Sequence, residues 1–269
     1  MALQPAAGAR DLNPQQVESN QQLTRRLADV YRIWGYEEVS PPRVERLETL
    51  IAGGAIESKE IVRLVANEPL GLRPEMTASI ARAACKRLSK KQRPLRLWSS
   101  GTVFTSRESI EGGIFIEENL QSGVELFGEK NISAEMELLS LLLKSMEILN
   151  LNKTHNPILL ISHTELMELI LKSIEPQLKD IIRDNLVKFD NLYLENMEID
   201  LKAKKKLVEA QRIRGIPTDV IKKLEILYGK NKVLDDLKRI FKMLQPLADS
   251  YGIRLQLDPT FQPHFELYT

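Results

Sequence analysis

The sequence lacks the features that define several common classes of protein. It contains one cysteine, Cys85, which excludes an intrachain disulfide framework and is typical of a protein in a reducing cytosol. We expect this thiol to be buried and unreactive. No apolar run approaches the roughly 18 residues of a membrane span, and the N-terminus has no charged-then-apolar signal pattern. These absences predict a cytoplasmic protein with no membrane segment.

Further absences limit the chemistry. The three histidines, His155, His163 and His264, are scattered without ligands at metal-binding spacing, and no phosphate-binding loop or dinucleotide fingerprint follows a strand. We therefore predict no metal site and no cofactor. Lysine plus arginine (38) nearly balance aspartate plus glutamate (37), so the net charge of +1 gives no long-range field that would attract nucleic acid. The basic clusters "KRLSKKQRPLR" and "KAKKK" are expected to be solvated helix faces.

What the sequence does contain is a clear order of helices and strands in its first half. A helix is expected over residues 14–34, with Asn13 as N-cap, Pro14 at the first position and Gly35 just past the end. The segments "EIVRLVA" and "GLRPEM" read as two short strands, and a helix follows from Thr77. The segments "LRLWSSGTVFT" and "IFIEENLQSGVELFG" predict a long antiparallel pair joined by the polar loop "SRESIEGG".

The second half is mainly helical in pattern. A helix over "SAEMELLSLLLKSMEIL", capped by Ser133, and a buried strand "NPILLISH" complete a core of residues 1–163. Residues 164–250 predict a helical insertion, and residues 251–269 predict return strands of the core. The pattern stops in mid-strand, so we expect a truncated product with an exposed sheet edge. The fold class is α+β.

Polar residues occupy one side of the predicted strand 114–127. Period two places Gln121, Gly123 and Glu125 together, which fits a solvated sheet face or a ligand site. Glu75 and Thr77, at a junction of strand and helix, fit either a capped helix start or part of the same site. Taken together, these residues could bind a small zwitterion with a nitrogenous ring, such as histidine. Glu75 and Thr77 would accept from the ammonium, while Gln121 and Glu125 would hold the ring.

Several motifs resemble a known family. "GARDLNP", "WGYEEVSPPRVE", "LRPEMTASIAR", "RLWSSGTVF" and "LQSGVELFG" are similar to the catalytic core of class II histidyl-tRNA synthetases, most clearly over residues 1–165. Within that superfamily, "LGLRPEMTASIAR" looks most like the ATP phosphoribosyltransferase regulatory subunits of histidine biosynthesis. The resemblance implies a class II aminoacyl-tRNA synthetase-like antiparallel sheet flanked by helices. It also implies a protein that lacks an anticodon-binding domain and does not aminoacylate tRNA.

The resemblance assigns roles to five residues. It implies that Glu75 and Thr77 hold the ammonium of histidine and that Gln121 and Glu125 face the imidazole. Tyr268 would match the second tyrosine of a late histidine-specific motif.

The departures from the synthetase pattern affect adenylation. Thr105 stands where synthetases have an arginine for the ATP α-phosphate, and Pro263 stands where the late motif has its catalytic arginine. Arg107 lies nearby, but the resemblance does not make it a substitute. The third synthetase motif, with another ATP-binding arginine, would lie beyond Thr269. We therefore predict no catalytic residues.

The leading hypothesis is a regulatory subunit that binds a short-form ATP phosphoribosyltransferase catalytic subunit. The resemblance also implies a homodimer through the helix and strand around residues 14–39, and L-histidine as an effector, either in the cradle or at a subunit interface. The alternative is a histidyl-tRNA synthetase or a fragment of one. Another amino-acid ligase-like enzyme or a tRNA-binding module would be a third use of the same core.

Overall fold

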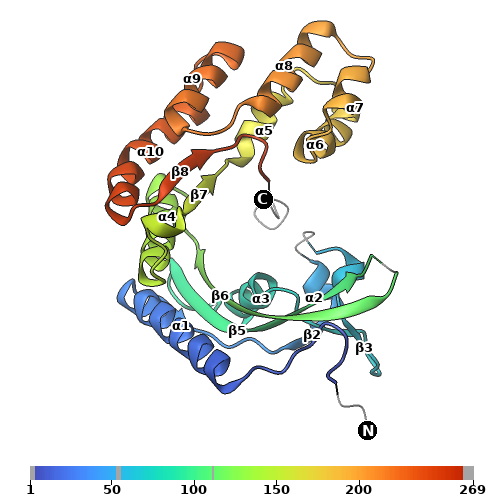
Figure 1. The fold of residues 1–269 in the computed structure, drawn as a ribbon, viewed down its shortest axis with the longest axis vertical. Helices are drawn as coiled ribbons and strands as arrows, with labels where there is room; N and C mark the ends of the chain where they lie inside the picture. Colours follow the sequence, from blue (N-terminus) through green and yellow to red (C-terminus); the bar gives the residue numbers. More distant parts are fainter. Residues whose placement is uncertain (1–3, 53–55, 111, 263–269) are drawn as a thin grey trace. The chain divides into compact units, whose positions relative to one another are not determined.

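The computed structural model describes residues 4–52, 56–110 and 112–262 (Figure 1). These residues form two compact units, which divide between Ala134 and Glu135. The first unit combines strands with helices, and the second contains most of the helices around a short parallel pair of strands. The α+β class expected from the sequence is confirmed.

Helix α1 (Pro14–Ile33) begins and ends where the sequence predicts. The Asn13 side chain accepts a hydrogen bond from the Gln16 backbone N–H at 2.9 Å, and the Gln16 side chain accepts one from the Asn13 N–H at 3.0 Å. This capping box satisfies two N–H groups that the helix itself leaves free. The helix ends just before Gly35, whose φ of 82° lies in the left-handed region.

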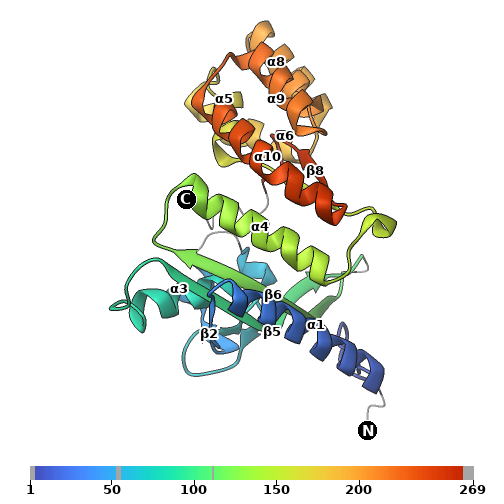
Figure 2. The same ribbon diagram turned by 90° about the vertical axis from the view of Figure 1, so that its left-hand side faces the viewer.

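The centre of the first unit is the hairpin of β5 (Leu95–Glu108) and β6 (Ile114–Phe127), paired from Leu95 and Phe127 to Glu108 and Ile114. The pair is longer than predicted, because residues 106–108 of the expected loop continue the ladder. Strand β1 (Glu37–Glu38) adds to β5 in parallel. Helix α1 lies across the hairpin (Figure 2), where the Tyr31 and Trp98 rings have centroids 5.7 Å apart.

A second small sheet precedes the hairpin in the chain. Strands β2 (Val44–Arg46), β4 (Leu70–Leu72) and β3 (Arg63–Leu64) pair antiparallel in that order. Short helices α2 (Leu47–Ile51) and η1 (Ser58–Glu60) connect them. The two short strands predicted from the sequence are present, although β4 ends at Leu72, before "RPEM".

Helix α3 (Thr77–Lys86) follows β4 and packs on the face of the hairpin opposite α1. Met76, Ile80 and Ala84 form its buried stripe at helical spacing, in one apolar cluster with Leu97. Cys85 lies outside that stripe and is exposed. The expectation of a buried thiol is therefore wrong, because helix phase rather than residue type decides its exposure.

Helix α4 (Ile132–Ile148) confirms the predicted helix but not its cap. The Asn131 side chain accepts from the Ala134 backbone N–H at 3.0 Å, so Asn131 caps the helix. Ser133, the cap expected from the sequence, lies inside the first turn instead.

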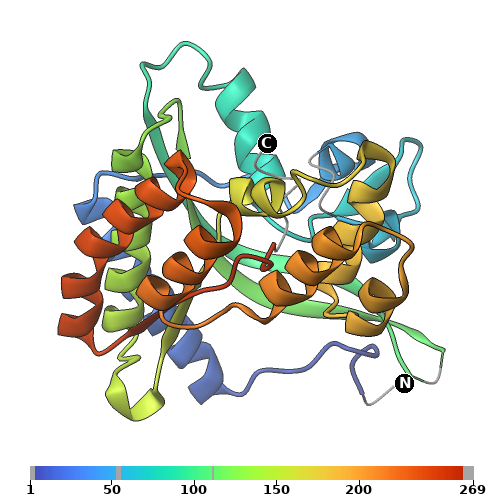
Figure 3. The same cartoon turned by 90° about the horizontal axis from the view of Figure 1, so that it is seen from above.

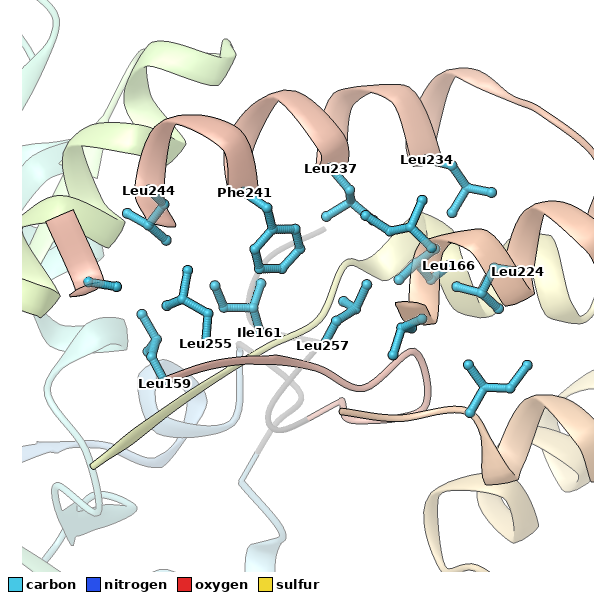
Figure 4. Close-up of a cluster of buried hydrophobic side chains, with 14 of the residues drawn as sticks. Leu159, Ile161, Leu166, Leu224, Leu234, Leu237, Phe241, Leu244, Leu255 and Leu257 are labelled. Atoms are coloured by element: carbon cyan, nitrogen blue, oxygen red, sulfur yellow. The ribbon is translucent and has the colours of Figure 1, made fainter. Parts of the chain in front are cut away.

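The second unit is built on two parallel strands. Strand β7 (Ile158–Ile161) pairs with β8 (Arg254–Leu257), and Gly215 forms a bridge to Leu257 on the other side of β8. Helices α9 (Pro217–Tyr228) and α10 (Lys232–Tyr251) lie side by side in Figures 1 and 3 and cover these strands. The apolar cluster between strands and helices is drawn in Figure 4, with Leu159, Leu224, Phe241 and Leu257 among its residues.

The helices expected over residues 164–250 are present. They comprise α5 (Thr164–Ile170), η3 (Pro176–Leu178), α6 (Lys179–Val187), α7 (Asn191–Asn196), α8 (Leu201–Arg212), α9 and α10; a further short helix, η2 (Lys153–His155), precedes β7. A second buried cluster, which includes Leu171, Leu186 and Leu207, joins α5, α6 and α8. The boundaries at 163 and 250 stay a prediction. Of the strands expected over 251–269, β8 is described, and the second lies outside the described residues.

The lysines of "KAKKK" belong to helix α8. The Lys204 ammonium donates to the Glu195 carbonyl at 2.9 Å, and Lys206 lies 5.5 Å from the Tyr228 ring centroid. These contacts engage two of the cluster's cations within the protein, as expected for a helix surface. Within the described ranges, none of the helices combines the length and apolar character that crossing a membrane requires.

Candidate functional site

The polar residues predicted on β6 share one face of the hairpin. Gln121, Gly123 and Glu125 lie directly opposite Gly101, Ser99 and Leu97 of β5. Cross-strand partners point to the same side of a sheet, so this is also the face on which α3 packs through Leu97. Gln121 and Glu125 are half-buried. The face is therefore not the open, solvated sheet surface that was one reading of the sequence.

The carboxylate of Glu75 holds the start of α3. Its Oε1 accepts from the Ala78 backbone N–H at 2.9 Å, and its Oε2 accepts from the Thr77 N–H. Met76, at the N-cap position, makes no capping bond with its side chain. Glu75 therefore caps the helix, which leaves the Thr77 hydroxyl available for another partner.

Thr77 and Glu125 come together across the gap between α3 and β6. Burial raises the pKa of the Glu125 carboxyl, hydrogen bonding from the Thr77 side chain lowers it, and the negative charge of Glu75 raises it further. Glu125 is thus acted on by Glu75 and Thr77, which were predicted from a different motif. A cationic or N–H-bearing group placed here would favour the ionised form of Glu125.

Gln121 offers an unused acceptor beside this pair. Its Oε1 is buried and makes no hydrogen bond with any described residue, a state that costs free energy unless a ligand or water supplies a donor. A Cβ built on Gly123, between Gln121 and Glu125, would meet no atom within 4 Å. The glycine therefore leaves open space on the face between the amide and the carboxyl. We call Glu75, Thr77, Gln121 and Glu125 the cradle.

The other residues singled out in the sequence are only partly placed. Tyr268 and Pro263 lie outside the described residues. Thr105 lies opposite Glu117 on the cradle's side of the hairpin. Arg107 contacts Glu60 at 2.9 Å and Glu117 at 3.5 Å, so two carboxylates engage the arginine nearest to the expected phosphate position.

Two of the three histidines, His155 and His163, lie among the described residues. His163 Nδ1 accepts from the Glu165 backbone N–H at 3.1 Å and so caps α5, and His155 lies in η2. In the described part of the chain, no group of three or more histidine, cysteine, aspartate or glutamate side chains could hold a metal ion.

Sequence reasoning missed Arg73, a buried residue beside the cradle. Its guanidinium lies against Gly101, the glycine opposite Gln121. The signal in the sequence that could have pointed to Arg73 was the presence of two glycines, Gly101 and Gly123, on the same face of the hairpin. The space above Gly123 is open, whereas the Arg73 guanidinium occupies the space above Gly101.

The hairpin is covered on one face by α1 and on the other by α3, and the cradle lies on the second face, as the sequence predicts for a class II aminoacyl-tRNA synthetase-like protein. The family model described as histidyl-tRNA synthetase matches residues 8–269. The chain belongs to the histidyl-tRNA synthetase family and, within it, to the group of ATP phosphoribosyltransferase regulatory subunits. The resemblance stated from the sequence is confirmed.

Two relatives place the chain in that group. The ATP phosphoribosyltransferase regulatory subunit of Prochlorococcus marinus (strain MIT 9303) is 62% identical over 269 residues, which are 100% of this chain and 69% of the relative. The protein of the same name from Synechococcus sp. (strain CC9902) is 61% identical over the same shares.

Solved structures agree on the fold. An ATP phosphoribosyltransferase regulatory subunit/histidyl-tRNA synthetase from Bacillus halodurans matches with a TM-score of 0.86 and 23% identity, over 100% of this chain and 71% of that one. The ATP phosphoribosyl transferase (HisG:HisZ) complex from Thermotoga maritima matches with a TM-score of 0.66 and 16% identity, over 92% of this chain and 83% of that one. These matches confirm the class II synthetase-like fold.

Proposed function

We propose that this chain is the regulatory subunit of an ATP phosphoribosyltransferase, required for the first step of histidine biosynthesis and for its feedback regulation by histidine. The observation that carries the proposal is 62% identity over the whole chain to a relative named as such a subunit. The neighbour from Thermotoga maritima is a complex, which supports a short-form catalytic subunit as the partner of this chain.

The charges on the cradle's side of the hairpin support a role without adenylation. An arginine that binds phosphate must present free N–H groups to it. Thr105 has no such group, and Arg107 is engaged by Glu60 and Glu117. Glu117 itself would repel a phosphate. The alternative of an active histidyl-tRNA synthetase is therefore not favoured.

The effector in this proposal is L-histidine, bound in the cradle. Its ammonium would lie against the Glu75 carboxylate and the Thr77 hydroxyl, and its imidazole N–H would donate to Glu125 or to the buried Oε1 of Gln121. Gly123 leaves room for the ring. The support comes from the buried acceptor without a donor and from the carboxyl whose pKa burial raises, since a ligand N–H would relieve both.

Regulation requires that histidine and the catalytic subunit affect each other's binding. The coupling is reciprocal: if histidine binding weakens an active arrangement of the complex, that arrangement weakens histidine binding by the same factor. The cradle is suited to this role because Glu75 belongs both to the ligand site and to the start of α3. A ligand that draws on the Glu75 carboxylate would change the hydrogen bonds that fix the helix.

The chain would form a homodimer through α1 and β1. The surface around α1 exposes several apolar side chains, which is typical of a surface that contacts another protein. Leu12, Val17 and Leu23 are each about two-fifths exposed, and Leu120 of β6 is nearly half exposed. A groove of about 720 Å³ runs beside them, lined by Arg10, Leu12, Asn20, Leu120 and their neighbours. A second copy would bury this surface.

The test is the rate of phosphoribosyl-ATP formation by a short-form catalytic subunit with and without this chain. The proposal expects a rate increase that depends on this chain, together with co-elution of the two proteins. A catalytic subunit whose rate and elution do not change at micromolar concentrations of this chain would contradict it.

A further inference from the structure

Arg73 is a buried arginine at the edge of the cradle. It follows β4, and its backbone joins two sheets, because its N–H donates to the Arg43 carbonyl at 2.9 Å and its carbonyl accepts from the Phe104 N–H at 2.9 Å. Only 4% of the residue is exposed. Arginine is almost never this buried without partners.

Two of the three guanidinium nitrogens have partners. The Nε donates to the Thr102 carbonyl at 3.1 Å, and the Nη1 donates to the Pro41 carbonyl at 2.7 Å. Both acceptors are neutral backbone groups, so the charge is fixed in place without being cancelled by an ion pair. Among the described residues, Nη2 makes no hydrogen bond.

Gly101 shows where Nη2 lies. A Cβ built on Gly101 would be 2.6 Å from that nitrogen, so the guanidinium occupies the space on the side of β5 to which a side chain at 101 would point. Gly101 is directly opposite Gln121, and cross-strand partners share a face. The Nη2 therefore lies on the cradle's face, next to the rung that carries the unused Gln121 acceptor.

The charge of Arg73 complements its surroundings. Burial lowers the pKa of its guanidinium and Arg43 lowers it further, while Glu45 and Glu75 oppose the change. An arginine keeps its proton under such conditions. The cradle thus has carboxylates at Glu75 and Glu125 and a fixed cation at Arg73, the charge pattern that complements a zwitterion.

We propose that Arg73 binds the carboxylate of the amino acid in the cradle through Nη2, and so makes the site specific for an intact amino acid over the corresponding amine. The inference rests on the proposed function, since it takes histidine as the ligand. Thr105 and Pro263 stand in place of the two arginines of the synthetase pattern. Among the described residues, Arg73 is the cation that lies beside the cradle on this face. It is a binding residue and takes no part in a reaction.

The test compares L-histidine with histamine, which has the same ring and amine but no carboxylate, by titration calorimetry on the full chain. The wild type should bind L-histidine at least about tenfold more tightly, the value of one charge-assisted hydrogen bond. In Arg73→Gln, the affinity for L-histidine should fall to that for histamine, while the affinity for histamine should change less than about threefold. Arg73→Lys should keep part of the preference.

Gly101→Ala provides a second variant in case Arg73→Gln does not fold. The added methyl displaces Nη2 without removing the charge, so the preference for L-histidine should shrink, whereas Gly113→Ala, on the turn of the hairpin, should leave it unchanged. Equal affinity of the wild type for both ligands, or an equal loss of both in Arg73→Gln, would overturn the role of Arg73 alone. Binding of neither ligand to the wild type would overturn the cradle as well.

Discussion

The carboxylate of Glu75 accepts a hydrogen bond from the Ala78 backbone N–H at 2.9 Å, so one wall of the cradle is also the cap of helix α3. Removing this side chain should therefore have two effects. We expect Glu75→Ala to lower the free energy of unfolding by about 1 kcal/mol, the usual cost of a lost cap. It should also weaken L-histidine binding by about 1.5–3 kcal/mol. Urea unfolding and calorimetry measure the two separately, and a variant with wild-type affinity would remove Glu75 from the ligand site.

Glu125 should behave differently, because it caps no helix. Glu125→Ala is expected to weaken L-histidine binding by about 1.5–3 kcal/mol without the loss of stability that is expected for Glu75→Ala. Glu108→Ala, at the exposed end of the same hairpin, is the matched control and should change neither quantity. Calorimetry that gives Glu125→Ala and Glu108→Ala the same affinity would contradict the cradle.

The raised pKa of Glu125 predicts a pH dependence of stability. Because its pKa in the folded chain lies above the ordinary glutamate value of 4.5, the folded state holds this proton more tightly than the unfolded state. The stability from protonated Glu125 is complete below about pH 4.5 and is lost as the pH rises through the raised pKa. Glu125→Gln should thus become more stable than the wild type with rising pH. If denaturation curves from pH 4 to 8 show a constant difference in the free energy of unfolding between Glu125→Gln and the wild type, this prediction is refuted.

Much of this architecture could be predicted from local signals. The ends of α1 follow from Asn13, Pro14 and Gly35, which act within one turn, and the shared face of Gln121 and Glu125 follows from strand period. The predictions that were wrong, the cap of α4 and the burial of Cys85, depend on which of several neighbouring side chains takes a given position. Asn131 and Ser133 are both good caps, and only the backbone path selects Asn131. Whether Cys85 is buried depends on the phase in which α3 meets the sheet.

The position of Arg73 could not be predicted for a related reason. Its partners, Pro41 and Thr102, come from two distant segments, and no periodicity relates them to Arg73. Likewise, sequence alone could not show that the ion pairs of Arg107 with Glu60 and Glu117 would form, because η1 and the hairpin meet only in the folded unit.

Filling the cradle should block the ligand while sparing the fold. Gly123→Val adds a side chain where no atom lies within 4 Å of the Cβ, and valine suits a β-strand. We expect L-histidine affinity to fall at least about tenfold, more than 1.4 kcal/mol, with an unchanged or higher Tm. If the variant unfolds at lower temperature, the space above Gly123 is not open and the cradle must be drawn differently.

The buried ion pair between Arg82 and Glu45 should stabilise the first unit. Arg82 donates to Glu45 Oε1 at 2.6 and 3.2 Å, and the Glu45 side chain is 7% exposed. Arg82→Ala leaves a buried carboxylate without its partner, which costs about 3 kcal/mol. Lys59→Ala breaks an exposed pair with Glu57, which water and salt screen, so it should lower the free energy of unfolding far less than Arg82→Ala does. Equal losses in the two variants, measured by urea unfolding, would contradict the burial of Glu45.

The parallel strands of the second unit depend on the apolar cluster of α9 and α10. Leu224 is fully buried in that cluster, whereas Ile226 on the same helix is 84% exposed. Leu224→Ala should lower the free energy of unfolding by about 2–5 kcal/mol, and Ile226→Ala by less than about 0.5 kcal/mol. Chemical denaturation followed by circular dichroism compares them, and a larger loss in Ile226→Ala would reverse the orientation of α9.

The most direct test of the account is inhibition of phosphoribosyl-ATP formation by L-histidine, measured on complexes of a short-form catalytic subunit with wild-type chain or with Glu125→Ala. The account predicts that both complexes are active without histidine and that inhibition of the variant complex requires at least about tenfold more histidine. The same inhibition curve for both complexes would contradict the central claim that the cradle senses histidine.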